Sequence, residues 1–150
     1  MARNLKDGER LNLNNMAKNG YVLASTTGDS DVRFVIWRVV AADVDTASDS
    51  TVSGDFEFPY TGTITEIGAY NDTAGATGTM VVDVHLNGTT IMTTDKLDID
   101  TTEKTTRTAA TAPTLTTTAI TAGDILTCDI DAVHTTAAKG LTIRIGIRLD

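Results

Sequence analysis

The side chains with the most obvious chemical potential in this chain are aspartates spaced two residues apart. On a strand this spacing places both carboxylates on one face, whereas in a loop it can begin a Ca²⁺ site that backbone carbonyl oxygens complete. The twelve-residue EF-hand pattern is absent, and aspartate is the ordinary outward polar residue of an acidic chain with little glutamate. We therefore predict no metal site, and if calcium were bound, the first two pairs, expected in loops, would be the better ligands. The four pairs are Asp29 with Asp31, Asp43 with Asp45, Asp98 with Asp100, and Asp129 with Asp131.

Two histidines, His85 and His134, are the remaining side chains that could act as acid, base or zinc ligand. Each is expected on an outward face or in a loop, and neither has the cluster of Cys, His or Glu that a zinc site or a catalytic dyad requires. The chain also lacks a Gly-x-Ser-x-Gly nucleophile elbow and a glycine-rich phosphate loop. The sequence therefore predicts no catalytic residue, no enzyme and no cofactor.

The net charge of the chain restricts the classes of partner that the protein is expected to bind. The 150 residues include 12 Lys and Arg against 20 Asp and Glu, a formal net charge of −8. This argues against nucleic-acid binding, which needs a basic surface. No run of 18 apolar residues occurs and the first residues do not resemble a signal peptide, so no membrane association is expected. The single cysteine, Cys128, alternates with Leu126 and Ile130 and is expected in the core.

The elements that must position any site are predicted to be short strands. Threonine makes up about a fifth of the chain, and the helix-favouring residues Glu and Lys are rare. Asn87-Gly88 is typical of a two-residue type I′ hairpin turn, which would set Leu86 opposite Thr89. We predict an all-β, jelly-roll-like antiparallel β-sandwich of about eight strands over residues 21–150, with residues 1–20 as an extended N-terminal arm. In the last strand the residues expected to face inward are Leu141, Ile143, Ile145, Ile147 and Leu149.

Residues 32–40 are apolar on both faces of the expected strand. This pattern is typical of a strand covered on both sides, by its own domain or by a partner subunit. Phe34, Ile36 and Trp37 are therefore candidate residues of a subunit interface. Farther along, we expect residues 43–54 and 101–113 to be loops and residues 114–121 to be a polar strand.

Four segments of the chain resemble small tailed-phage virion proteins with a jelly-roll sandwich, of the capsid decoration, head-fibre and tail-fibre types. The segments are residues 58–70, 79–92, 120–128 and 140–149, so the resemblance covers about residues 55–150. Its motifs are structural: a Val-Asp-Val-x-x-Asn-Gly-Thr hairpin from Val82 to Thr89, a Gly-Asp turn at Gly123, and a closing Leu-Thr-Ile strand from Leu141. The resemblance implies a virion component that is commonly a homotrimer, and it transfers no catalytic residue.

The first functional expectation is a capsid decoration (cement) protein that binds the major capsid protein of an assembled head. It would be located in the virion and assembled in the host cytoplasm. The arm is mildly basic and would hold the capsid. Two alternatives stay open, namely a fibre or receptor-binding protein that recognises host surface glycans and a calcium-dependent carbohydrate-binding module. The candidate capsid contacts are Arg3, Lys6, Arg10, Leu11, Leu13 and Lys18.

Overall fold

A computed structural model describes residues 32–149, with only the backbone described for 49–54, and this range contains strands and no helix. The strands form two antiparallel sheets, which confirms the predicted all-β sandwich. The first sheet has the order β1 (Val32–Asp45), β9 (Lys139–Leu149), β3 (Gly62–Tyr70) and β7 (Ala119–Ile120). The second has the order β2 (Asp49–Glu57), β8 (Ile125–Ala132), β4 (Met80–Leu86) and β5 (Thr89–Thr90), and β6 (Leu97–Ile99) also pairs with β4.

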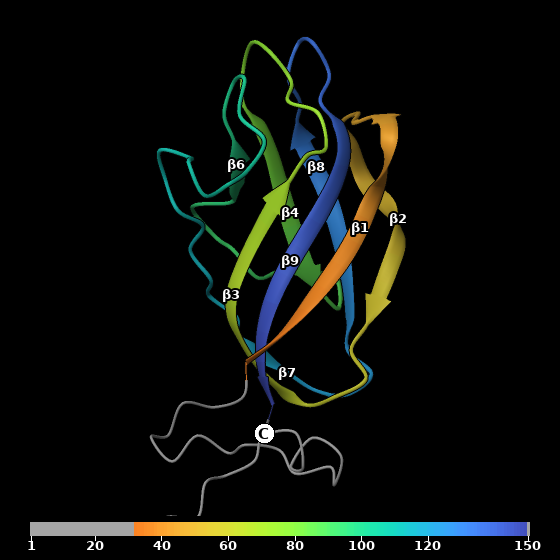
Figure 1. Ribbon diagram of the computed structural model, residues 1–150. Helices are drawn as coiled ribbons and strands as arrows, with labels where there is room; N and C mark the ends of the chain where they lie inside the picture. Colours follow the sequence, from red (N-terminus) through yellow and green to blue (C-terminus); the bar gives the residue numbers. More distant parts are fainter. Residues whose placement is uncertain (1–31, 150) are drawn as a thin grey trace, which may run out of the picture. The chain divides into compact units, whose positions relative to one another are not determined.

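The strand pairs are nested along the chain. β1 pairs with β9, β2 with β8, β3 with β7, and β4 with β5 and β6, all antiparallel. β9 also pairs with β3, and β8 with β4, so each sheet mixes strands from both halves of the described range. In Figure 1 the strands β3, β9 and β1 form the nearer layer, and β4 and β8 lie behind them.

The core lies between the two sheets and is supplied by alternate residues. The inward residues of β9 are buried from Leu141 to Ile147, as the alternation predicts. Met80, Val82 and Val84 of β4 face them from the second sheet and are fully buried. Cys128 is also fully buried, which confirms its predicted place in the core.

The hairpin between β4 and β5 forms as its sequence predicts. Asn87 and Gly88 have φ angles of 50° and 80°, the left-handed conformation that a type I′ turn requires. Leu86 lies opposite Thr89. Side-chain hydrogen bonds between Asn87 and Asp124 (2.9 Å) and between the Ile125 amide and Asn87 Oδ1 (2.9 Å) tie the turn to the start of β8.

Two predicted boundaries are wrong. Residues 43–54 are not a loop, because β1 continues to Asp45 and β2 begins at Asp49. Small and acidic residues have a low preference for strands. Their backbone groups nevertheless pair with those of β9 and β8, because ladder pairing does not depend on the side chain. Conversely, only Ala119–Ile120 of residues 114–121 is a strand, since the amides of Thr114 and Thr116 donate to the loop carbonyls of Asp95 and Ile91.

The arm predicted over residues 1–20, and its boundary, lie outside the described residues. Within the described range no helix is present that could cross a membrane.

Candidate interaction surface

The two sheets carry opposite charge. The strands of the first sheet hold five basic and three acidic residues, whereas those of the second hold seven acidic residues and neither Lys nor Arg. The basic residues of the first sheet are Arg33, Arg38, Lys139, Arg144 and Arg148, and its acidic residues are Asp43, Asp45 and Glu66. The acidic residues of the second are Asp49, Asp55, Glu57, Asp83, Asp98, Asp129 and Asp131. The strand residues of the two sheets therefore differ in net charge, although the whole chain is acidic.

The outer side of the first sheet combines these arginines with exposed apolar side chains, and we call it the arginine face. The register sets Val32 opposite Arg148, Phe34 opposite Gly146, and Ile36 opposite Arg144. Phe34 is 52% exposed and Ile36 is 58% exposed. Exposed large apolar side chains that recur along one strand mark an interaction surface more often than isolated ones do. The residues of the arginine face are Val32, Phe34, Ile36, Arg38, Glu66, Tyr70, Thr142, Arg144 and Arg148.

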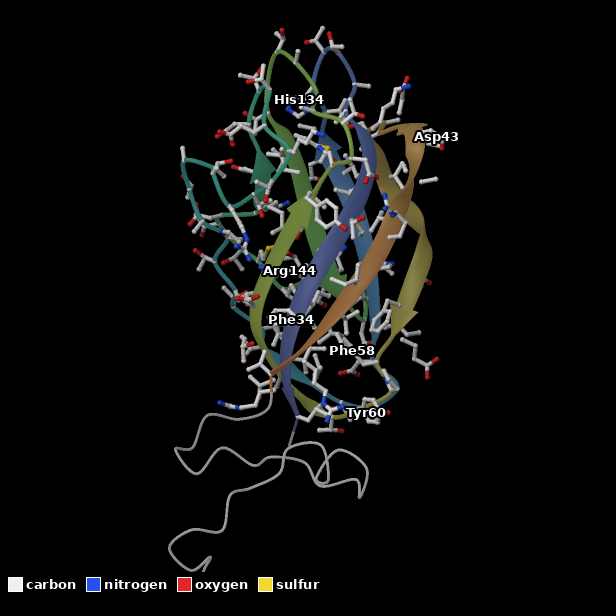
Figure 2. The ribbon with its side chains drawn as sticks, in the orientation of Figure 1. Phe34, Asp43, Phe58, Tyr60, His134 and Arg144 are labelled. Atoms are coloured by element: carbon white, nitrogen blue, oxygen red, sulfur yellow. The ribbon has the colours of Figure 1, made fainter. Side chains whose placement is uncertain are left out.

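The middle of the arginine face is a cluster of three side chains from three strands. The Arg144 guanidinium lies 5.2 Å from the centre of the Phe34 ring, and its Nη2 is 3.2 Å from Glu66 Oε1. Gly146 makes this packing possible, because a Cβ there would approach Glu66 Cγ to 2.6 Å and Phe34 Cε1 to 3.2 Å. Figure 2 shows Phe34 and Arg144 near one another on the nearer sheet. The cluster therefore holds Phe34 and Arg144 in place while leaving both accessible.

Toward the far end of β1 the arginine face is held by ion pairs. Arg38 forms an ion pair with Asp72, and Lys139 Nζ lies 3.6 Å from Asp45 Oδ1. Thr142, opposite Arg38 on β9, is buried, and its hydroxyl has no hydrogen-bond partner within the described part of the chain. The two ion pairs therefore lie beside the exposed apolar residues of β1, as charged residues do at the rim of a protein interface.

A hollow of about 210 Å³ adjoins the cluster on the β3 side. The loop over residues 101–113 forms one wall, because the Thr106 amide donates to the Ala69 carbonyl (3.0 Å) and the Ala69 amide donates to Thr106 Oγ1 (3.1 Å). The hollow thus combines two guanidinium groups, a phenol and threonine side chains. Its lining residues are Gly68, Ala69, Tyr70, Thr105, Thr106, Arg107 and Arg144.

A second hollow of about 200 Å³ opens at the end of the sandwich where β1 begins. Phe34 lines it together with Phe58 and Tyr60, and Tyr60 is 62% exposed. The rings of Phe56 and Phe58 meet edge to face, with centroids 5.2 Å apart. Figure 2 shows Tyr60 and Phe58 at this end and His134 at the opposite end. The hollow extends the exposed apolar surface of the arginine face around the end of the first sheet.

The outer side of the second sheet carries a separate polar cluster around Asp83. Asp83 is 4% exposed, and its carboxylate accepts hydrogen bonds from Lys96 Nζ (2.8 Å) and Thr90 Oγ1 (2.6 Å). Lys96 Nζ also lies 2.7 Å from Asp131 Oδ2. Burial raises the pKa of Asp83, but the hydrogen bonds from Lys96 and Thr90 and the nearby charges lower it more, so the net pKa lies below its ordinary value.

His85 completes this cluster between two carboxylates. Its Nε2 is 3.2 Å from Asp83 Oδ2, and its Nδ1 is 3.5 Å from Asp129 Oδ2. Asp83 and Asp129 are directly opposite each other across the strands, an arrangement that repels unless positive groups lie between them. Lys96 joins Asp83 to Asp131, and His85 contacts both Asp83 and Asp129, so the cluster forms a polar network that stabilises the sheet.

The other predicted chemical residues are dispersed. His134 was expected on an outward face or in a loop, and it lies in the loop after β8. Its side chain is nevertheless buried, with Nε2 3.3 Å from the Asp100 carbonyl oxygen. A Cβ at Gly75 would come within 2.4 Å of its Nδ1, so the ring fills space beside that glycine. Asp43 and Asp45 lie on β1 and not in a loop. In the described part of the chain no three His, Cys, Asp or Glu residues are grouped to hold a metal ion.

The candidate interface residues do not all share one surface. Phe34 and Ile36 lie on the arginine face, whereas Trp37, which alternates with them, lies in the core and is 6% exposed. Arg144 and Glu66 were not among the residues predicted from the sequence. The alternation in residues 141–149 does place Arg144 on the outward face of the last strand, and this signal could have identified it. The candidate capsid contacts Arg3, Lys6, Arg10, Leu11, Leu13 and Lys18, and the pair Asp29 and Asp31, lie outside the described residues.

Neither a family model, nor a curated protein, nor a solved structure matches this chain.

Proposed function

We propose that this protein is a structural component of a bacteriophage virion, and more narrowly a capsid decoration protein with a jelly-roll body. The sequence resemblance over about residues 55–150 supports a virion component. The nested pairing of β1 with β9, β2 with β8 and β3 with β7 supports a jelly roll, because a long antiparallel hairpin that rolls into two sheets gives this order. The role is binding and not catalysis.

The arginine face is the single observation that carries the proposal. Arginine and aromatic residues are enriched in protein interfaces, and charges at an interface are concentrated at its rim. Phe34, which is more than half exposed, and Arg144 beside it fit the first pattern, and Ile36 adds exposed apolar surface next to them. A surface of this kind, on a chain with a net charge of −8, suits a protein partner with acidic and apolar groups.

The partner in this proposal is the major capsid protein of an assembled head. A protein that binds only the assembled lattice stabilises that lattice by mass action. Many copies on a symmetric shell would add avidity to contacts that are individually modest. The basic residues of the arm, with Leu11 and Leu13, would supply further contacts.

Cosedimentation with expanded phage capsids tests this function. The full chain and a chain lacking residues 1–20 are mixed with capsids over a range of concentrations, and the pelleted fraction is measured. Saturable binding of the full chain supports a decoration protein, and its loss on truncation supports the arm as an anchor. Absence of saturable binding to capsids contradicts the proposal.

A fibre or receptor-binding protein is the second candidate, and the hollow beside Tyr70 favours it. Tyrosine rings stack on sugar rings, and Arg107 and Arg144 would suit the carboxylate of an acidic sugar. Retention of the protein on host cells or cell-surface glycan, lost in the Arg107→Ala variant, would support this function. Equal retention of the variant and the wild type would contradict it.

A further inference from the structure

We propose that Asn87, in the turn between β4 and β5, is a deamidation site, and that Asp124 sets the rate of this modification by holding the Asn87 side chain. The sequence contains Asn-Gly at two positions, Asn19 and Asn87, of which the first lies outside the described residues. Asparagine before glycine loses its side-chain amide readily, because glycine has no Cβ to hinder attack by its own amide nitrogen. Residues 87–89 are exposed, so water has access to the turn.

The reaction takes place within the chain and needs only water. The Gly88 amide nitrogen forms a bond to Cγ of Asn87, the bond from Cγ to Nδ2 breaks, and Nδ2 leaves as ammonia with the proton of the Gly88 amide. The product is a five-membered succinimide ring. Water then adds to either carbonyl of this ring and opens it, which leaves aspartate or isoaspartate at position 87. No atom is oxidised or reduced, and either product carries a carboxylate where the amide was.

In the folded protein the Asn87 side chain is held at both of its polar atoms. Nδ2 donates to Asp124 Oδ1 (2.9 Å), and Oδ1 accepts from the Ile125 amide (2.9 Å). The Asn87 backbone amide also donates to the Ile125 carbonyl (2.8 Å). Ring closure expels Nδ2 and turns Cγ toward the Gly88 nitrogen, so the hydrogen bond to Asp124 must break first. These bonds therefore slow deamidation in the native state.

Asp124 is itself held in a turn. Its Oδ2 accepts from the Thr121 amide (2.7 Å), and its own amide donates to the Thr121 carbonyl (3.0 Å). The hydrogen bonds from the Asn87 side chain and the Thr121 amide lower the pKa of Asp124, so its carboxylate is charged at neutral pH. Asp124 thus presents a fixed, charged acceptor to the Asn87 amide, and hydrogen bonds to charged acceptors are the stronger ones.

Deamidation would reverse the interaction between positions 87 and 124. A carboxylate at position 87 has no donor for Asp124, and two carboxylates in contact repel each other. Isoaspartate also lengthens the backbone by one methylene group, which changes the geometry that the type I′ turn requires. Either product loosens the β4–β5 turn from the start of β8. This modification goes beyond the proposed function and does not depend on it.

Peptide mapping by mass spectrometry of the full chain, incubated at pH 8, measures the conversion of Asn87. In urea, where the chain is unfolded, Asn87 and Asn19 should convert at similar rates because both precede glycine. In the native wild type, Asn87 should convert at least about tenfold more slowly than in urea, since two side-chain hydrogen bonds hold it. Asp124→Ala should raise the native rate by about fivefold or more, the factor expected for the loss of one hydrogen bond. Asp124→Asn keeps an oxygen acceptor and should convert as slowly as wild type.

Two control variants separate this contact from effects of charge and of general stability. Asp43→Ala removes an exposed carboxylate from the first sheet, and Gly75→Ala destabilises the fold beside His134. Both should leave the native rate at Asn87 unchanged, and thermal unfolding establishes that each variant is folded during the incubation. Equal rates in native and unfolded wild type, no conversion of Asn87 in urea, or an Asp124→Ala rate no higher than that of Gly75→Ala would each overturn the proposal.

Asn87→Asp tests the consequence of the modification. The midpoint of thermal unfolding should fall by about 2–4 °C, as expected for one lost hydrogen bond in a chain of this size. The loss should be smaller when Asn87→Asp is combined with Asp124→Asn, because the amide introduced at position 124 can donate to the new carboxylate. Equal losses in the two backgrounds would contradict repulsion between these positions.

Discussion

Replacing Lys96 by methionine tests whether the polar cluster on the second sheet is structural. The change keeps the length of the side chain but removes the ammonium that lies 2.8 Å from Asp83 and 2.7 Å from Asp131. Asp83 would remain buried, with Thr90 and His85 as its remaining partners among the described residues. A hydrogen bond to a charged group contributes about 1.5–3 kcal/mol, and the exposed ion pair with Asp131 adds less than about 1 kcal/mol. We therefore expect Lys96→Met to lower the free energy of unfolding by about 2 kcal/mol at pH 7.

The deficit should depend on pH in a defined direction. In the wild type the pKa of Asp83 is lowered, so its stabilising effect is present above the unfolded value of 3.8 and is lost as the pH falls through the folded value. Lys96→Met removes the hydrogen bond and the positive charge by which Lys96 lowers the pKa of Asp83, so this pKa rises. The variant should therefore be least stable relative to wild type near pH 7, and the difference should shrink below about pH 4 as Asp83 becomes protonated.

Urea unfolding at pH 7, 5 and 3.5 measures both effects. Lys104→Met is the matched control, because Lys104 is exposed and donates only to the Asp72 carbonyl among the contacts that the structure records. We expect the control to change the free energy of unfolding by less than about 0.5 kcal/mol at every pH. If Lys96→Met were no more destabilising than the control, or were stabilising, the interpretation of this cluster as a structural network would be wrong.

Three further predictions concern the core. Ile143→Ala, at a fully buried position of β9, should cost about 2–5 kcal/mol in urea unfolding, whereas Ile125→Ala, at a position 39% exposed, should cost less than about 1 kcal/mol; equal costs would contradict the assigned core. Gly75→Ala should cost about 1–3 kcal/mol in the same assay, because its Cβ would overlap the buried His134 ring, and an unchanged midpoint would refute this packing. Burial raises the pKa of the Cys128 thiol to about 12, so alkylation at pH 8 should be undetectable in the native protein and complete after unfolding. Rapid labelling of the native protein would be inconsistent with a cysteine in the core.

The sequence predicts those parts of the fold that depend on local pattern. Residues 141–149 alternate strictly, and Asn87-Gly88 demands one type of turn, so the last strand and the β4–β5 hairpin could be assigned without coordinates. The β1–β2 hairpin could not, because its small acidic residues have little strand preference and are held by the backbones of β9 and β8.

The candidate surface was predictable only in part, for a related reason. Phe34 and Ile36 stand out in the sequence as apolar residues of an apolar strand. Their neighbours Arg144 and Glu66 are far away in the chain and come together only through the register of β9 with β1 and β3. The same holds for Lys96, whose partners Asp83 and Asp131 lie on two different strands. Local periodicity carries no information on such pairings.

The central claim is that the arginine face binds the capsid, and a comparison of two variants on expanded phage capsids tests it most directly. The first variant replaces both Phe34 and Ile36 by serine, and the second replaces Ile125, an exposed apolar residue of the other sheet, by serine. We predict that the first variant weakens cosedimentation by about tenfold or more and that the second binds like wild type. Equal binding of the two variants, or no binding of the wild type, would contradict the account.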